Sequence, residues 1–416
     1  MTIKKVLVIG GGAAGMLAAF FARKNGAEVT LIERNEKLGK KIYITGKGRC
    51  NVTNSAEMDE FMRAIVRNPR FMYASFAHFN NQDMITLMER LGVPLKVERG
   101  NRVFPVSDHS SDIIAGLRRG LEREGVRIAY DARAEHLIIR DGKCCGVSIE
   151  GGEQLAADAV IVCTGGLSYP TTGSMGDGYA LAKEAGHSIV NPIPALVPIE
   201  TKESWPAILS GLSLKNVALR AWKTGGKKKK YFYDEQGEML FTHFGISGPL
   251  VLTLSSYLPD KLDDVRMCID LKPALDEQTL DARLLRDFKE YSRKQLVHVM
   301  DGLVPHNLGL QILVLAGISP QMPVNSVTQA QRAEILRLLK NLPLTPKAFR
   351  GFNEAIITRG GVNVREVNAS TMESKLVSGL YFAGEVLDLD AHTGGFNLQI
   401  AFSTGALAGS CASQEV

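Results

Sequence analysis

A glycine-rich stretch near the amino terminus constrains the fold more than any other part of the chain. Residues 6–33 read VLVIGGGAAGMLAAFFARKNGAEVTLIE: a β-branched run, a glycine cluster, a helical pattern and a second β-branched run. Gly10, Gly12 and Gly15 have the spacing G-x-G-x-x-G, which serves a tight turn, the approach of a pyrophosphate and close helix–strand packing. This order predicts a βαβ unit that binds a dinucleotide at the helix amino terminus, with Glu33 bonded to the adenosine ribose.

Two other interpretations fit parts of this stretch. Glycines also mark ordinary turns, so one alternative is a βαβ unit that binds no ligand. The other is a secretory signal, because Lys4 and Lys5 precede an apolar run. Three consecutive glycines, the lack of a small-residue cleavage site and the continuing βαβ pattern argue against a signal. We therefore interpret the stretch as nucleotide-binding.

Composition narrows the class of protein. The chain has 416 residues, 45% of them hydrophobic and 22% charged, which predicts two or three soluble domains. The net charge of +5 suits an anionic cofactor but is too scattered to predict nucleic-acid binding. Six cysteines without a C-x-x-C motif or histidines at metal spacing predict reduced thiols and no metal. No apolar run is long enough to cross a bilayer, so we expect a cytoplasmic protein that does not bind membranes.

A polar, glycine-rich segment follows the second strand. Residues 39–54 read GKKIYITGKGRCNVTN and lack apolar periodicity, so we expect a long loop. Long ordered loops beside a nucleotide site are commonly functional. Gly46 and Gly48 can expose backbone N–H groups, and Lys41 and Arg49 offer positive charge to a pyrophosphate or an anionic substrate. A solvated basic loop is the alternative.

The residues after this segment alternate between helical and strand patterns. Residues 126–130 and 159–163 predict further strands of the parallel sheet, and the second ends in T-G-G, where the chain can pass close to a cofactor. A hairpin is expected near residues 95–106 and a three-stranded antiparallel meander at residues 134–155. Helices are expected at residues 56–66, 69–79, 82–91, 111–124 and 179–185.

The middle of the chain has a different character. Three prolines follow Asn191 closely and mark a domain boundary. A β domain is expected next, and residues 275–315 are mainly helical in pattern. The basic run at residues 227–230 predicts a solvated hairpin tip, with a phosphate or nucleic-acid patch as the alternative. The strands expected in this β domain are residues 216–223, 229–233 and 238–242.

The carboxyl-terminal residues again show the order of strand, glycines and helix that characterises the start of the chain. Residues 378–383 predict a strand, and Gly384 and Glu385 follow it directly. The sequence HTGGFN at residues 392–397 then opens a helix that continues to about Ala408. A second glycine-opened helix amino terminus is a second anion site, suited to the pyrimidine edge of a flavin.

Together, these segments resemble a known family. GGGAAG with Glu33, TGKGRCNVTN, CTGG, FTHFGISGP, TMESK and YFAGEVLDLDAHTGGFNLQIAFSTG are similar to the motifs of BaiN/RdsA-type, YhiN-like bacterial flavoproteins, over nearly the whole chain. Phe396 and Ile400 depart from that pattern, because the family often has Tyr and Trp there. The resemblance implies an α/β fold: a two-dinucleotide-binding, Rossmann-like FAD domain with an inserted β-barrel domain and a small helical subdomain. The expected boundaries are residues 1–191 and 351–416 for the FAD domain, 192–272 and 323–350 for the barrel-like insertion, and 273–322 for the helical subdomain.

The resemblance also implies noncovalently bound FAD. Glu385 resembles the acidic residue that holds the ribityl chain or pyrophosphate, and a solvated carboxylate at a strand end is the alternative. The expected FAD-binding residues are Gly10, Gly12, Ala13, Ala14, Gly15, Glu33, Arg34, Lys41, Gly46, Gly48, Arg49, Asn51, Ala134, Thr164, Gly165, Gly166, Gly384, Glu385, Gly395, Phe396, Asn397, Leu398 and Gln399.

The activity implied is that of an FAD-dependent oxidoreductase. The family's best-described reaction is reduction of carbon–carbon double bonds in steroid enones with a nicotinamide donor, and we expect reduction of an activated double bond in a small molecule. The steroid does not transfer, because no motif here points to one. Only one G-x-G-x-x-G exists, so NAD(P)H is expected as a transient donor. The sequence does not predict the oligomeric state.

Three side chains are candidate catalytic groups: Arg49, His243 and His392 each lie in a glycine-flanked motif and can polarise a carbonyl or donate a proton. The alternatives are a phosphate clamp for Arg49 and structural roles for the histidines. Two other functions stay open, a flavin-bearing redox sensor using Cys50 and an FAD-dependent RNA-modifying protein. Neither explains a domain inserted between two halves of an FAD domain, whereas an enzyme needs such a lid.

Overall fold

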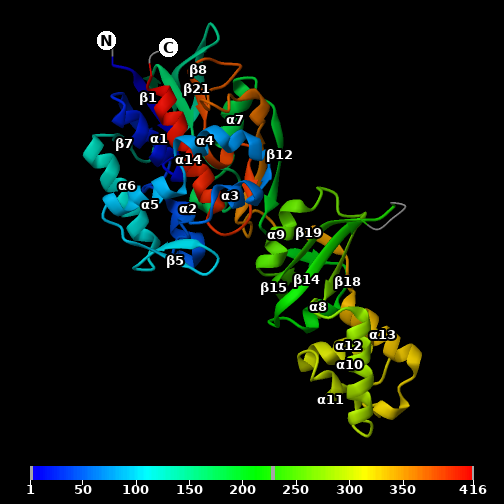
Figure 1. Ribbon diagram of the computed structural model, residues 1–416. Helices are drawn as coiled ribbons and strands as arrows, with labels where there is room; N and C mark the ends of the chain where they lie inside the picture. Colours follow the sequence, from blue (N-terminus) through cyan, green and yellow to red (C-terminus); the bar gives the residue numbers. More distant parts are fainter. Residues whose placement is uncertain (1–2, 226–229, 415–416) are drawn as a thin grey trace. The chain divides into compact units, whose positions relative to one another are not determined.

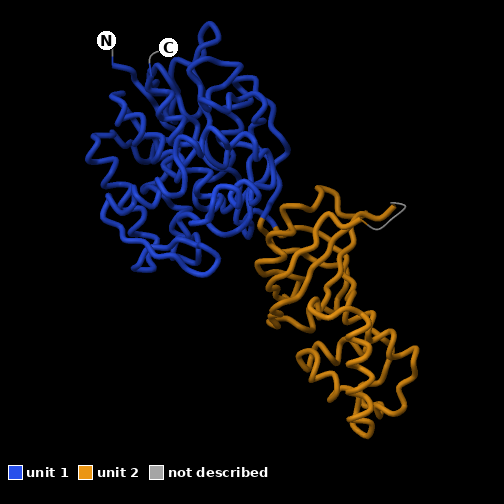
Figure 2. Tube along the Cα trace, in the orientation of Figure 1, with its two compact units in different colours: residues 1–195, 351–416 blue, residues 196–350 orange. Residues whose placement is uncertain are grey.

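The chain folds into two compact units, seen in the computed structural model of Figure 1. The structure describes residues 3–225 and 230–414, so Lys227, Lys228 and Lys229 of the predicted hairpin tip lie outside the described residues. One unit comprises residues 1–195 and 351–416, and the other residues 196–350 (Figure 2). Each unit has its own buried apolar core.

A five-stranded parallel sheet forms the centre of the first unit, in the order β21-β11-β1-β2-β7. Strands β11 and β1, both inside the sheet, are apolar and buried on both faces, as in sheets covered on both sides. The register places Val8 between Leu31 and Ile161. The parallel sheet predicted from the sequence is therefore confirmed. Its strands are β1 (Lys5–Ile9), β2 (Glu28–Ile32), β7 (Arg127–Ala129), β11 (Ala159–Val162) and β21 (Leu380–Phe382).

The first and last helices of the unit pack directly on each other. Helix α1 (Ala13–Lys24) and helix α14 (Phe396–Ala412) lie side by side in Figure 1. A Cβ added at Gly405 would lie 2.2 Å from the carbonyl oxygen of Ala14, and one at Gly409 would lie 2.1 Å from that of Ala18. Only glycine permits this approach, so the tail is locked against the helix that follows the glycine turn.

Smaller sheets surround this centre. The predicted hairpin and meander are present, as the sheets β3-β6-β5 and β10-β9-β8. The expectation of a plain loop at residues 39–54 is wrong, because the segment contains the short helices α2 (Lys40–Ile44) and η1 (Thr45–Gly48). Each is too short to show apolar periodicity in sequence. The other elements are β3 (Thr53–Asn54), β4 (Ile65–Arg67), β5 (Leu95–Glu98), β6 (Arg102–Pro105), β8 (Ala134–Arg140), β9 (Lys143–Ile149), β10 (Gln154–Ala156), β12 (Ile189–Ala195), β20 (Ile357–Val362), β22 (Asp390–Ala391), α3 (Met58–Ala64), α4 (Tyr73–His78), α5 (Asn81–Arg90), α6 (Ser110–Glu124) and α7 (Asp177–Glu184).

The second unit is built on a seven-stranded antiparallel sheet, in the order β18-β17-β14-β15-β16-β13-β19, where the sequence predicts a barrel-like domain. The strands predicted at residues 229–233 and 238–242 belong to one strand, β15 (Tyr231–Thr242). The polar residues in the middle of β15 pair with β14, and the pairing has a register shift on each side of them. In the sequence, these polar residues look like a break between two strands. The remaining elements are β13 (Ile199–Thr201), β14 (Ser213–Lys223), β16 (Gly245–Ser247), β17 (Val265–Asp270), β18 (Leu342–Leu344), β19 (Pro346–Phe349), α8 (Trp205–Ile208), α9 (Pro249–Tyr257), α10 (Glu277–Glu290), α11 (Leu296–Met300), α12 (His306–Leu315) and α13 (Gln329–Lys340).

Candidate cofactor-binding site

The glycine turn after β1 has one open position and two closed ones. Gly10 has φ of +100°, and a Cβ there would lie 2.6 Å from the carbonyl oxygen of Cys163. A Cβ on Gly15 would lie 1.8 Å from the carbonyl oxygen of Gly10. At Gly12, with φ of −82°, an added Cβ meets no described atom within 4 Å. Since Gly12 is the N-cap of α1, the space beside it suits a phosphate group that approaches free helix N–H groups.

The acid at the end of β2 is fixed beside this turn. Glu33 is buried, and its Oε2 accepts a hydrogen bond of 2.7 Å from the backbone N–H of Gly11. Its Oε1 accepts from the backbone N and the side-chain Nδ2 of Asn35, at 2.8 and 2.6 Å. The carboxylate therefore holds the turn in shape, and its predicted bond to a ribose stays a prediction.

Two further expected FAD-binding residues are Arg34, just after β2, and Ala134, the first residue of β8. Arg34 forms an ion pair of 2.6 Å with Asp177 at the start of α7, and Arg133 pairs with the same carboxylate at 2.9 Å. This carboxylate raises the pKa of Arg133. Ala134 is buried at the start of β8. Two arginine side chains thus share the single negative charge of Asp177.

A second polar centre joins three distant segments. Glu385 accepts hydrogen bonds from Lys41 Nζ at 2.6 Å, Ser168 Oγ at 2.6 Å and the backbone N–H of Thr358 at 2.8 Å. A Cβ on Gly166 would lie 2.5 Å from Thr358 Oγ1, so this close packing needs glycine. The structure thus brings Lys41, Gly166 and Glu385 together, as expected for residues of one site.

Gly384 links this centre to the glycine turn. Its φ is +80°, and an added Cβ would lie 2.7 Å from the Cβ of Ala14 in α1. Ala13 and Ala14 are both buried. The Glu385 centre and the first turn of α1 are therefore parts of one region within the first unit.

Two buried oxygens in this region have no hydrogen-bond partner in the described part of the chain. They are Thr164 Oγ1, at the end of β11, and Asn51 Oδ1, beyond η1. Buried polar atoms are nearly always paired in folded proteins. Gly165 beside Thr164 has φ of +73°, which turns the chain here. These atoms fit a polar ligand such as a dinucleotide, and both belong to the expected FAD-binding set.

The loop at residues 45–51 has an unusual backbone. Gly46, Lys47, Gly48 and Cys50 all have positive φ, at 57°, 58°, 86° and 58°. Cys50 is fully buried, and burial raises the pKa of its thiol to about 12. A protonated, buried thiol is a poor redox sensor, which weighs against that alternative function.

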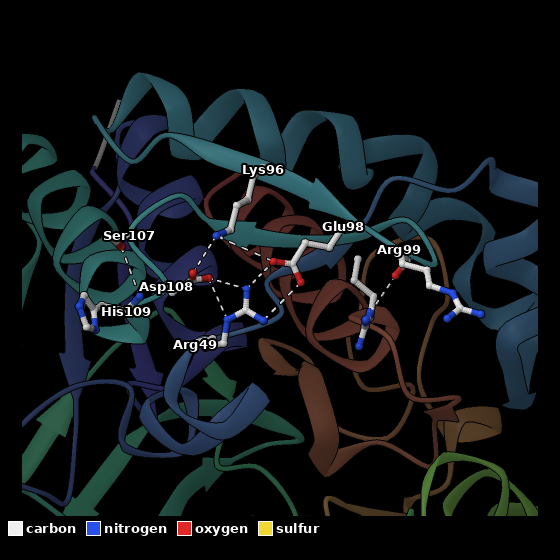
Figure 3. A network of polar contacts seen from close by, with 8 residues as sticks. Arg49, Lys96, Glu98, Arg99, Ser107, Asp108 and His109 are labelled. Atoms are coloured by element: carbon white, nitrogen blue, oxygen red, sulfur yellow. Dashed lines mark hydrogen bonds and ion pairs between the residues drawn. The ribbon is translucent and has the colours of Figure 1, made fainter. Parts of the chain in front are cut away.

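Arg49 lies in this loop but its side chain turns to protein partners. Its guanidinium contacts Asp108, through Nε at 2.8 Å and Nη2 at 2.5 Å, and Glu98, through Nη2 at 2.5 Å and Nη1 at 3.3 Å. Figure 3 shows it between these two carboxylates, with Lys96 on their other side. All three guanidinium nitrogens are thus engaged. The roles predicted for Arg49, polarisation of a substrate carbonyl or a phosphate clamp, stay predictions, and either would require the guanidinium to leave these partners.

The start of α14 is held by its own side chains. Asn397 bonds the backbone of Ala391 and His392, and the buried Gln399 accepts from Thr53 Oγ1 at 2.7 Å. A Cβ on Gly395 would lie 2.4 Å from the backbone of Thr53. Phe396 is buried edge-on against Phe61 with ring centroids 4.8 Å apart, and Leu398 is partly buried. These contacts fix the start of α14, and the FAD contacts expected here stay predictions.

The two candidate histidines belong to different units. His392 is partly buried in the first unit, where burial lowers the pKa of its imidazole. His243 lies in the second unit, with its ring 4.9 Å from that of Phe244. A neutral imidazole is the form expected for His392 near neutral pH, so it accepts a proton more readily than it donates one.

Sequence reasoning missed a buried charged cluster beside β20. Asp390 is fully buried and bonds Arg67 at 3.0 Å. Asp388 is buried, its Oδ2 accepts from Asn68 Nδ2 at 3.1 Å, and burial raises the pKa of its carboxyl. Asp388 was visible in the sequence as part of GEVLD, but no pattern there predicts burial. Ser168 and Thr358 were missed because their contacts with Glu385 span more than 25 residues.

Two further kinds of site have no support in the part of the chain that is described. No group of three or more His, Cys, Asp or Glu side chains there can hold a metal ion. None of the helices described is both long and apolar enough to cross a membrane.

One protein family, curated relatives and solved structures are similar to this chain. The HI0933-like protein Rossmann domain matches residues 4–411. The 3-dehydro-bile acid delta(4,6)-reductase of Clostridium scindens is 31% identical over 420 residues, covering 99% of this chain and 100% of that protein. A ribosomal RNA dihydrouridine synthase of Haemophilus influenzae is 32% identical over 405 residues, covering 96% of each. The solved 3-ketosteroid-delta4-(5alpha)-dehydrogenase from Rhodococcus jostii is similar in fold, with a TM-score of 0.53 and 15% identity over 99% of this chain and 97% of that one.

Proposed function

The chain belongs to the HI0933-like family of Rossmann-fold flavoprotein oxidoreductases, and on that premise we propose that it reduces a carbon–carbon double bond conjugated with a carbonyl group. The membership agrees with the resemblance found in the motifs. The proposal assigns FAD as the resident cofactor, NAD(P)H as the transient electron donor and a small molecule as the substrate.

The relatives' names support the reaction rather than the substrate. A bile acid delta(4,6)-reductase and a dihydrouridine synthase act on very different molecules. One name is that of a reductase and the other that of an enzyme that makes a dihydro product, so both indicate addition of hydrogen to a double bond. Because this chain is similar to each over nearly the full length of both proteins, the shared chemistry is the part that we propose for it.

The open position at Gly12 is the observation that carries the cofactor assignment. The fold itself requires glycine at positions 10 and 15 but leaves free space beside Gly12. Gly12 and the N–H groups of α1 would hold the pyrophosphate, Glu33 the ribose, and Lys41 and Glu385 the ribityl chain. When bound, FAD supplies a hydride donor that can be recharged by a nicotinamide.

The protein's own groups must then orient the substrate and supply a proton. Carboxylates beside Arg49 raise the pKa of its guanidinium, so it is an unsuitable acid. His392 favours its neutral form, as described above. Asp388 has a raised pKa and therefore keeps its proton to higher pH than an exposed aspartate. We add Asp388 to His243 as a candidate proton source, and keep His392 as a group that can polarise the carbonyl.

Anaerobic stopped-flow spectroscopy tests the proposal. Purified protein should release FAD on acid treatment, and its flavin should be bleached by NADH or NADPH. Reoxidation should accelerate with conjugated enones far above the rate with buffer alone. Release of FMN or no flavin would refute the cofactor assignment, and fast reoxidation only by oxygen would identify an oxidase instead.

A second candidate substrate is uridine within RNA. Exposed basic side chains at Lys47, Arg99 and Arg102, near the Arg49 loop, form no ion pair with any described residue, so they are available for phosphates. A salt-sensitive shift of labelled ribosomal RNA, with formation of dihydrouridine, would favour this substrate. Turnover of free enones without RNA binding would favour the small molecule.

A further inference from the structure

The loop at residues 45–51 holds a conformation that its own sequence does not favour. Lys47 and Cys50 have positive φ, which costs a residue with a side chain about 1 kcal/mol or more. Within the loop, Arg49 N–H bonds the Gly46 carbonyl at 3.3 Å and Cys50 N–H bonds that of Thr45 at 3.0 Å. Contacts from outside the loop must therefore contribute to holding this backbone in place.

Arg49 makes the ion pairs that join this loop to the neighbouring hairpin, while Cys50 is buried in the core. The Arg49 guanidinium reaches Glu98 at the end of β5 and Asp108 in the turn after β6, and it stacks over the Phe104 ring at 4.2 Å. The Phe104 ring also lies near the loop backbone, 3.5 Å from the place of a Cβ on Gly46. The β5–β6 hairpin and the turn after it thus contact Arg49 through two carboxylates and one aromatic ring, and Figure 3 shows the two carboxylates beside Arg49.

The positive charge of Arg49 is already balanced by carboxylates of the protein, so it attracts an anionic ligand only weakly. Two carboxylates surround its single charge, and Lys96 lies 2.7 Å from Asp108 and 3.8 Å from Glu98. The four side chains are neutral as a group. A phosphate placed next to Arg49 would meet Glu98 and Asp108 as well, and those like charges would oppose its binding.

We infer that Arg49, Glu98 and Asp108 form a clamp that positions residues 45–51 for the cofactor, and that Arg49 acts on the cofactor only through this loop. The inference rests on the proposed FAD binding. It makes Glu98 and Asp108 positioning residues, although neither lies in a glycine-rich motif. It also removes Arg49 from the set of groups that touch the reacting atoms.

The two possible roles of Arg49 predict opposite changes in FAD affinity for the same variant. If Arg49 touched a phosphate of FAD, the double variant Glu98→Gln/Asp108→Asn would free its charge and tighten FAD binding. If the clamp acts through the loop, the same variant weakens FAD binding by roughly three- to tenfold, since each exposed ion pair contributes little. Arg49→Ala should then cause a loss of the same size, and the triple variant should be no worse.

Titration of FAD-free protein with FAD measures these dissociation constants, and the visible spectrum of bound flavin should shift alike in all three variants. Arg332→Ala is the matched control, because it removes an Arg–Asp pair of 2.8 Å in the second unit and should change neither quantity. Tighter FAD binding by the double variant, or additive losses in the triple variant, would overturn the clamp.

Hydrogen exchange separates this inference from the proposed function. In FAD-free protein, peptides covering residues 45–51 should exchange faster in all three clamp variants than in the unaltered protein and in Arg332→Ala. This readout needs no flavin, so a protein that binds no FAD would refute the proposed function and still test the clamp. Unchanged exchange in the loop would refute the clamp itself.

Discussion

At the scale of single residues, the glycine turn separates what the fold needs from what a cofactor needs. Gly10 and Gly15 are required because an added Cβ would meet backbone atoms. The space beside Gly12 has no such structural use within the described chain. The sequence motif predicts these different roles for the three glycines, and the geometry around each of them agrees with that prediction.

This difference gives a test at one atom. Gly12→Ala should lower the free energy of unfolding of FAD-free protein by about 1 kcal/mol or less, the cost of a poorer N-cap, while weakening FAD binding at least tenfold. Gly15→Ala should cost about 3 kcal/mol or more through overpacking. Urea denaturation and FAD titration measure the two effects. Equal FAD affinity in Gly12→Ala would place the pyrophosphate elsewhere.

The burial of one histidine predicts how the free energy of unfolding depends on pH in mild acid. His187 is buried, bonds Ser374 Oγ at 2.7 Å and lies 3.3 Å from Glu366. Burial lowers its pKa, against the opposing effect of Glu366. Between this lowered pKa and the unfolded value of about 6.5, the unfolded chain binds the extra proton, so stability falls as pH drops through this window.

The variant His187→Gln should therefore show a flatter dependence of unfolding free energy on pH between about 7 and 5. The expected difference is at most about 1.4 kcal/mol per pH unit, the limit for one proton. Exposed His109 provides the control variant His109→Gln, whose profile should match the unaltered protein. Identical profiles for His187→Gln would mean that this imidazole titrates as in the unfolded chain.

At the scale of elements, the contact between α1 and α14 leaves no room for a side chain at two positions of α14. Gly405→Ala and Gly409→Ala each force a methyl group against a backbone oxygen of α1. Each should lower the free energy of unfolding by about 1–3 kcal/mol and weaken FAD binding, because α1 carries the glycine turn. Gly351→Ala, whose Cβ would meet no described atom within 4 Å, should leave both quantities unchanged. Unaltered stability in the α14 variants would show that the helices can separate slightly at no cost.

Local patterns were enough to predict many of these elements. The βαβ unit, the hairpin and the meander could be predicted because their partners are neighbours in sequence. The partners of Arg49 and Glu385 could not, since Asp108 lies 59 residues from Arg49 and Lys41 lies 344 from Glu385. The sequence identified these two side chains as important but could not say that each is already paired within the protein. Burial of Asp388 was likewise unpredictable from its polar neighbours.

At the scale of the whole molecule, each unit has its own core. The expected FAD-binding residues all belong to the first unit, so FAD should protect that unit selectively. A ligand at 100 times its dissociation constant stabilises by about 2.7 kcal/mol. Hydrogen exchange should therefore slow in the strands of the parallel sheet on adding FAD, while α10 and α12 of the second unit stay unchanged. Equal protection in both units would show that FAD couples them into one cooperative body.

The contact of Gly405 with Ala14 also has a consequence for synthesis. A ribosome releases the chain from its amino terminus, and domains generally fold as they emerge. Residues 196–350 are synthesised as one uninterrupted unit. The glycine turn at residues 10–15, by contrast, is synthesised almost 400 residues before α14, the helix that packs against α1. A truncation before Phe396, which removes α14, would leave the second unit complete and α1 without the helix that packs on it. Folding of the first unit should thus depend on α14.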